Sequence, residues 1–349
     1  MKLVFDGDVC LIEENEQFEA KSAEGGIPLS MWETYSAFAN SFGGTIVLGL
    51  DETRDGLLAV KGVKDAERTI KDIWNTINDQ QKISCNILKS DDVRIVEHNG
   101  KKLVSVSVPR ADRHDCPIYI NDNIRGGTFR RNGPNDYRCS KPEIAGMMRD
   151  SSDTPMDSLA LDEFDMNDID RNTLSGFRNY MKIGDDRYLL NALSDDEFLK
   201  MIGASKKGKD GEQHPTLAGL LMFGREYRIT NEVPYYKLEY IEHMYTGVKW
   251  EYRIDSGDGH WTGNIYDFYS NVANRLKVTI GRPLVIGDDW IRVDDNDVDK
   301  AIRESLINAL VHADYRGRTG VRIEVYPKTL IFRNPGLFRI PVKEAVDGG

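Results

Sequence analysis

The chain has 349 residues, of which 40% are hydrophobic and 30% charged, and its formal net charge is −11. This composition excludes a disordered or fibrous chain. The negative net charge also argues against sequence-independent binding to nucleic-acid phosphates, because the affinity of such binding comes from Lys and Arg side chains that displace counterions.

The sequence contains no apolar run of membrane-spanning length, and its amino-terminal segment turns acidic too early for a signal peptide. We therefore expect a cytoplasmic protein without a membrane partner. Its length predicts two domains, with a link between them. We place the first domain at 1–150, an acidic linker with a helical segment at 151–215, and the second domain at 216–349.

In the first domain, the segment ETYSAFANSFGGTIVLGLDE has small and apolar residues at helical spacing, followed by a Gly-Gly turn and a continuous apolar run. This pattern predicts a helix that leads into a buried strand. Further along, Asn99-Gly100 separates two alternating runs, which predicts a β-hairpin. The first domain is therefore expected to be α+β.

The second half begins with helical patterns at 171–202 and a loop rich in Lys and Gly at 203–215, which lacks the order of a phosphate-binding loop. The segment TLAGLLMFG then predicts a short apolar helix, and PYYKLEYIEHM a strand. VDKAIRESLINALVHADY predicts an amphipathic helix, and VRIEVYP with LIFRN predicts a final pair of strands.

Acidic and basic residues cluster near the amino terminus. Glu19 and Lys21 share one face if QFEAK is extended, Glu14 precedes them, and Asp51 follows the apolar strand. Three converging carboxylates can bind divalent metals that act on a phosphodiester, with a lysine to offset the developing charge. A solvated acidic surface is the alternative explanation, and spacing alone favours it.

A second candidate site is the stretch from Arg110 to Lys141, where seven basic residues meet four acidic ones. Aromatic residues lie between the arginines, a mixture that suits stacking on unpaired bases and contact with phosphates. A hairpin with core aromatics and solvated arginines is equally compatible with the pattern. The candidate nucleic-acid-binding residues are Arg125, Phe129, Arg130, Arg131, Tyr137 and Arg138.

The third candidate site lies on the amphipathic helix, where Glu304, Asn308 and His312 recur at intervals of four and share one face. Glu and Asn four residues apart, followed by a hairpin and a glycine turn, suit a Bergerat (GHKL) ATP site. In such a site the acid orients water and the amide helps to bind the metal. A helix with a polar outer face is the alternative, and spacing alone favours it.

The string E-x4-E-x-K, then AFAN-x-x-GG-x-I-x-x-G-x-D from Ala37 to Asp51, then the basic GGTFRRNGPN segment, resembles the Schlafen/Alba-like domain over about residues 10–148. The resemblance implies a mixed-sheet nucleic-acid domain. It also implies that Glu14, Glu19 and Asp51 match the Mg²⁺- or Mn²⁺-binding catalytic acids of the family's nucleases. One departure is Ala20, where the family has Phe.

The segments TLAGLLMFG, ESLINALVHADY and LIFRNPG resemble the RecG-carboxy-terminal-like, GHKL-related ATP-binding module over about residues 216–346, as in bacterial "divergent AAA" regulators. The resemblance implies an α/β sandwich. Its ATP-site residues would be Glu304, Asn308, His312, Asp314, Asn334 and Gly336. Two departures argue against ATP as a cofactor: NPG replaces the DxGxG turn, and PVKEAVDGG ends the chain before the expected lid and winged helix.

Together these patterns predict a bacterial DNA- or RNA-binding transcriptional regulator or defence protein with a degenerate or truncated ATP module, and they leave a homo-oligomer open. The alternative is a metal-dependent endoribonuclease acting on tRNA, other structured RNA or single-stranded DNA. A third hypothesis is an ATP-gated interaction protein that has no nucleic-acid partner.

Overall fold

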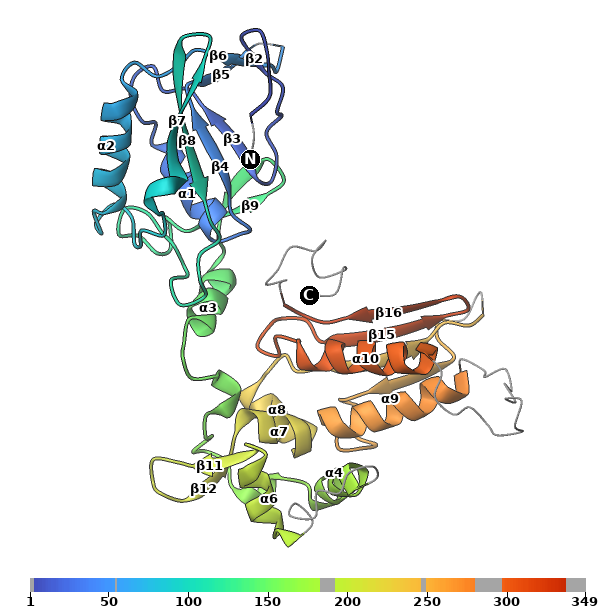
Figure 1. Ribbon diagram of the computed structural model, residues 1–349. Helices are drawn as coiled ribbons and strands as arrows, with labels where there is room; N and C mark the ends of the chain where they lie inside the picture. Colours follow the sequence, from blue (N-terminus) through green and yellow to red (C-terminus); the bar gives the residue numbers. More distant parts are fainter. Residues whose placement is uncertain (1–2, 54, 183–191, 246–248, 280–296, 337–349) are drawn as a thin grey trace. The chain divides into compact units, whose positions relative to one another are not determined.

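The computed structural model divides into two compact units (Figure 1). The first comprises the described residues of Met1–Asp153, and the second those of Thr154–Phe338. Both combine helices with β-sheets, so the predicted α+β class is confirmed. The residues that the structure describes are 3–53, 55–182, 192–245, 249–279 and 297–336.

The first unit is built on a four-stranded sheet with the order β3-β4-β8-β7, in which β3 and β4 are parallel and the other pairs antiparallel. A second sheet has the order β1-β2-β6-β5, and β9 pairs with β10 as a separate hairpin. The elements are β1 Phe5–Asp6, β2 Val9–Cys10, β3 Phe18–Lys21, α1 Ser30–Ala39, β4 Gly44–Leu48, β5 Leu50–Glu52, β6 Leu58–Val60, α2 Ala66–Ile77, η1 Ser90–Asp92, β7 Val93–His98, β8 Lys101–Val108, β9 Phe129–Asn132, β10 Asn135–Arg138 and α3 Lys141–Asp150.

The two faces of the β3-β4-β8-β7 sheet pack against different partners. Ile46 and Val104 point to the face covered by α1 and α2, whereas Val47 points to the face covered by the small sheet. Phe18 on β3 also packs with the small sheet. Because side chains alternate along a strand, Glu19 projects to the opposite face, toward α1 and the β9–β10 hairpin.

Glycine positions set two turns that the sequence predicts. Gly43, between α1 and β4, has φ +76°, and a Cβ there would lie 2.8 Å from the Val108 carbonyl oxygen, so glycine is required. Asn99 and Gly100 both have positive φ between β7 and β8, as a two-residue hairpin turn demands. The predicted helix–strand unit and hairpin are therefore confirmed.

The second unit contains a four-stranded sheet with the order β14-β13-β15-β16, in which β13 and β15 are parallel. Its apolar face packs with α7, α8, α9 and α10 in one core, and α4 and α6 share a smaller core with α7. The elements are η2 Met156–Ser158, η3 Met166–Asp168, α4 Arg171–Lys182, α6 Asp195–Met201, β11 Ser205–Lys207, β12 Gln213–Pro215, α7 Leu217–Phe223, α8 Glu226–Glu232, β13 Leu238–Glu242, β14 Tyr252–Asp255, α9 Ile265–Thr279, α10 Asp297–Val311, β15 Val321–Tyr326 and β16 Thr329–Arg333.

The loop expected at 203–215 is instead a short hairpin of β11 and β12. The imidazole of His214 anchors this hairpin: Nδ1 lies 2.6 Å from the Phe164 carbonyl oxygen and Nε2 lies 3.0 Å from the Asp210 carboxylate. The Lys- and Gly-rich composition of this segment predicts a loop and gives no sign of the contacts that His214 makes. Within the described segments, no helix combines the length and apolarity that crossing a membrane would require.

Candidate nucleic-acid and acid–base site

The E-x4-E motif folds as a tight turn that brings its two glutamates together. The backbones of Asn15 and Phe18 pair with each other, with N–H to O distances of 3.1 and 3.5 Å. The side chain of Asn15 also accepts a hydrogen bond from the Gln17 amide at 2.8 Å. After this turn, Oε1 of Glu14 accepts a hydrogen bond from the Ala20 amide at 3.0 Å, which holds Glu14 beside β3.

Glu19 is the buried carboxylate of this cluster, with only 6% of its surface exposed. Its Oε1 lies 2.5 Å from Nζ of Lys21, so the two side chains share a face, as their spacing predicts. Its Oε2 lies 2.6 Å from Nη2 of Arg131. Both oxygens of Glu19 are therefore ion-paired, which is the condition under which a buried carboxylate is tolerated.

Glu14 differs from Glu19 in its electrostatic surroundings. Partial burial raises the pKa of Glu14, the Ala20 amide and Lys21 oppose that rise, and the charges of Glu19 and Glu52 add to it. No ion-pair partner contacts Glu14 among the residues that the structure describes. Of the two glutamates, Glu19 therefore forms ion pairs, whereas the Glu14 carboxylate is held by a backbone hydrogen bond.

Asp51 lies in a different sheet from Glu19. Gly49, with φ +98°, ends β4 and redirects the chain into β5, where Asp51 pairs with Ala59 of β6. The described ranges contain no group of three or more His, Cys, Asp or Glu side chains arranged to hold a metal ion. The structure therefore brings Glu14, Glu19 and Lys21 together, but it does not assemble the expected three-carboxylate ligand set with Asp51.

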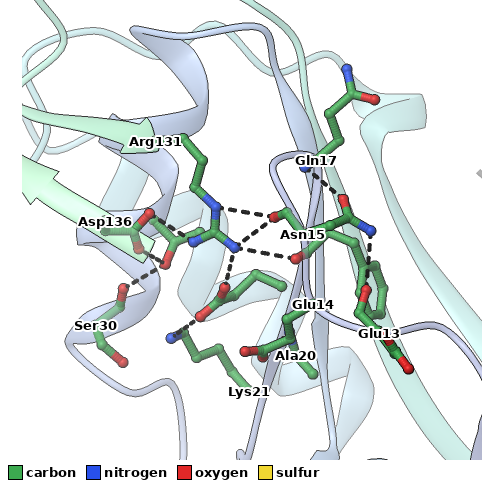
Figure 2. A network of polar contacts seen from close by, with 12 residues as sticks. Glu13, Glu14, Asn15, Gln17, Ala20, Lys21, Ser30, Arg131 and Asp136 are labelled. Carbon is green, nitrogen blue, oxygen red and sulfur yellow. Dashed lines mark hydrogen bonds and ion pairs between the residues drawn. The ribbon is translucent and has the colours of Figure 1, made fainter. Parts of the chain in front are cut away.

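Arg131 on β9 is the centre of the polar network (Figure 2). Its Nη2 donates to the carbonyl oxygens of Asn15 at 2.9 Å and Phe18 at 3.2 Å, in addition to Glu19. Its guanidinium carbon lies 5.1 Å from the centre of the Phe38 ring, a cation–π distance. The side chain is 2% exposed, so it is fully engaged within the protein.

Asp136 on β10 completes the network. Because Asp136 lies opposite Arg131 in the hairpin register, its Oδ1 accepts from Nη1 of Arg131 at 2.9 Å. Its Oδ2 accepts from the Thr34 hydroxyl of α1 at 2.6 Å. The sequence analysis did not identify Asp136, Thr34 or Asn15 as members of the site. For Asp136 the available signal was the hairpin register around the Asn132–Asn135 turn, which pairs it with Arg131.

The structure corrects part of the predicted nucleic-acid-binding set. Arg131 is buried in ion pairs, and Phe129 is 4% exposed in the core, so neither offers a surface to phosphates or bases. Arg130 is mostly buried and lies 3.5 Å from Glu143 of α3. The members that are exposed are Arg125, Tyr137 and Arg138.

Tyr137 and Arg138 lie next to each other on β10. Tyr137 is 52% exposed, on the hairpin face opposite to the one that carries Arg131. The guanidinium of Arg138 lies 5.8 Å from the centre of the Phe129 ring. The hairpin therefore combines an anchored inner face with an exposed aromatic ring and an exposed cation.

The third predicted site lies in the second unit. Glu304 and Asn308 are exposed on α10, and His312 is exposed just after the helix ends, where its amide donates to the Asn308 carbonyl at 3.1 Å. The amide of Asp314 donates to the Pro335 carbonyl at 2.8 Å, so the segment around Asp314 lies beside the turn of Asn334 to Gly336. Gly336 has φ +135°, a conformation that favours glycine.

Two family models match the chain. Residues 14–140 match the family described as Schlafen, AlbA_2, which includes the E-x4-E turn and the β9–β10 hairpin. Residues 145–239 match a domain of unknown function, DUF8451. No curated protein matches the chain.

Two solved structures are similar to the chain. The crystal structure of the DIP2311 protein from Corynebacterium diphtheriae is 18% identical over 94% of this chain and 62% of that one, with a TM-score of 0.40. The chain thus spans about three fifths of that protein's length. The solution structure of the N-terminal domain of a protein named as related to ATP-dependent DNA helicase RecG, from Nitrosomonas europaea, is 28% identical over 37% of this chain and 86% of that one, with a TM-score of 0.29.

Proposed function

We propose, from the Schlafen AlbA_2 domain at residues 14–140, that the first unit binds nucleic acid through the β9–β10 hairpin. The observation that carries this proposal is the hairpin's construction: Arg131 anchors its inner face, while Tyr137 and Arg138 are exposed. An exposed aromatic ring stacks on an unpaired base, and an adjacent guanidinium contacts phosphate. A regulatory or defence role for the protein follows as the wider proposal.

A binding experiment tests this function. Labelled tRNA and single-stranded DNA are titrated with the full chain at several salt concentrations, beside a variant carrying Arg125→Glu and Arg138→Glu. The matched control carries Arg68→Glu and Lys71→Glu, which make the same charge change on exposed positions of α2. We expect only the first variant to lose affinity and salt dependence. Equal binding by both variants would contradict the proposal.

Tyr137→Ala separates stacking from charge. Stacking on an aromatic side chain contributes about 1–3 kcal/mol per base on single strands, whereas a paired base offers no free face to Tyr137. We therefore expect weaker binding to single-stranded DNA and unchanged binding to a duplex of the same length. Equal losses on both would show that Tyr137 contributes in some way other than base stacking.

The Glu14–Glu19–Lys21 cluster favours a second candidate, cleavage of the phosphodiester backbone. In the network, the charges of Glu19 and Asp136 are balanced by Lys21 and Arg131, which leaves Glu14 as the acid available for proton transfer. Mg²⁺ or Mn²⁺ would supply a polarised phosphate and an activated water. Such an ion would compete with Lys21 and Arg131 for Glu19, because both oxygens of that carboxylate already have cationic partners.

Cleavage is tested with labelled tRNA and single-stranded DNA in the presence of Mg²⁺ or Mn²⁺. Glu14→Gln is the informative variant, since the glutamine Oε1 can still accept from the Ala20 amide while the side chain can no longer take up a proton. We expect the wild type to cleave and Glu14→Gln to be inactive. Cleavage by neither protein would exclude this candidate, and equal cleavage by both would indicate a contaminating nuclease.

A further inference from the structure

We propose that Arg131 is a positioning residue that holds both glutamates of the E-x4-E turn in place against the β9–β10 hairpin. The inference rests on the proposed function only for its biological meaning, because the contacts that carry it lie within the first unit. Figure 2 shows the guanidinium of Arg131 reaching from the hairpin to the Asn15 turn, with Asp136 on its other side.

Arg131 holds both ends of the tight turn. The carbonyl oxygens of Asn15 and Phe18, which are the two ends of the tight turn, both accept from Nη2 of Arg131. Glu14 directly precedes that turn and Glu19 directly follows it. Arg131 therefore hydrogen-bonds to the peptide units next to both glutamates, and it also forms an ion pair with the Glu19 carboxylate.

The shape of the arginine side chain suits this role. The Arg131 guanidinium donates to four different acceptors: the Asn15 and Phe18 carbonyls, Glu19 and Asp136. A planar guanidinium has five N–H donors fixed in a fork, whereas a lysine ammonium is a single donor centre. Lysine could keep one ion pair here but could not span these acceptors.

Two hydrogen bonds connect the hairpin to the region of α1. The Arg131 amide donates to the Ser41 hydroxyl at 2.9 Å, just after α1, and Asp136 accepts from Thr34 within α1. The hairpin is thus tied to α1 through Thr34 and to the turn after α1 through Ser41, while its Arg131 side chain holds the turn between the two glutamates. Arg131 thereby fixes the positions of both glutamates relative to the hairpin that carries the exposed Tyr137 and Arg138.

The experiment measures hydrogen–deuterium exchange of the full chain without nucleic acid. In Arg131→Lys we expect the segment 14–21 to exchange about tenfold faster, since a lost charge-assisted hydrogen bond corresponds to at least that factor. Segments in α2 and β8 should exchange as in the wild type. Arg68→Lys on α2 is the matched control and should leave 14–21 unchanged.

Two results would overturn the proposal: an unchanged rate in 14–21, or an equal acceleration in α2 and β8, which would mean that Arg131 supports the fold in general. If Arg131→Lys does not fold, Asp136→Asn serves instead. It removes the anionic partner of Nη1 and should produce a smaller acceleration in the same segment, and no acceleration would again overturn the proposal.

Nucleic-acid binding by Arg131→Lys is measured in parallel. We expect it to match the wild type, because Tyr137 and Arg138 remain in place, while any cleavage activity is lost. A loss of binding equal to that of Arg138→Glu would overturn the separation between the positioning role of Arg131 and the binding role of the exposed side chains. If the wild type itself does not bind, the proposed function is wrong, whereas the exchange rates still decide the role of Arg131.

Discussion

Arg131 and Glu19 are 112 residues apart in the chain, yet their side chains form a 2.6 Å ion pair that is almost entirely buried. The pair joins a hairpin near the end of the first unit to a strand near its beginning. A buried pair of this kind adds little net stability relative to apolar residues, but removing one partner is costly because it leaves a buried charge uncompensated.

Glu19→Gln should lower the free energy of unfolding by about 3 kcal/mol, because it leaves the buried Arg131 with less compensating charge. Urea unfolding of the full chain, followed by near-ultraviolet circular dichroism, measures the change. Glu13→Gln, at an exposed position of the same segment, should stay within about 0.5 kcal/mol of the wild type. Similar values for both variants would show that the ion pair contributes little.

Gly43→Ala should destabilise the first unit by about 2 kcal/mol or more. The residue has φ +76°, and a Cβ would press against the Val108 carbonyl, which is backbone and cannot rotate away. Gly25→Ala is the control, since a Cβ there meets nothing within 4 Å. Thermal unfolding of both variants provides the comparison, and an equal melting temperature would contradict the account of the α1–β4 turn.

His214 should make the stability of the second unit depend on pH. The Phe164 carbonyl and then Asp210 raise the pKa of His214 above its ordinary value of 6.5. The stabilisation is therefore complete below about pH 6.5 and is lost as the pH rises through the folded-state pKa. Unfolding of the wild type and of His214→Gln should differ more at pH 5.5 than at pH 8.5.

His260→Gln is the control for that measurement, because His260 is exposed. It should give the same difference from the wild type at both pH values. A pH-independent effect of His214→Gln would mean that the imidazole acts on the β11–β12 hairpin through packing alone.

Asn308→Ala tests the nucleotide hypothesis for the second unit. Asn308 is exposed on α10, so its removal should change the stability of the free chain by less than about 0.5 kcal/mol. If ATP with Mg²⁺ binds here, calorimetry should record heat for the wild type and for Asn274→Ala, an exposed position on α9, but not for Asn308→Ala. No heat from the wild type would remove ATP from the hypotheses.

Local signals in the sequence were sufficient for several of the elements and for part of the site. The apolar period and the Gly-Gly turn predicted α1 and β4, and the spacing of Glu19 and Lys21 placed them on one face of β3. These predictions succeed because helical and strand periods, and turns that require positive φ, depend on neighbouring residues alone.

Tertiary structure alone decided which charged residues are buried together. The sequence does not indicate that Arg131 is buried against Glu19 whereas Arg138 is exposed, because both are arginines on the same hairpin. The exit of the chain into a second sheet at Gly49 likewise put Asp51 in a different sheet from Glu19, which the sequence pattern did not indicate. Such pairings are set by strand order and register between distant segments, which local patterns do not encode.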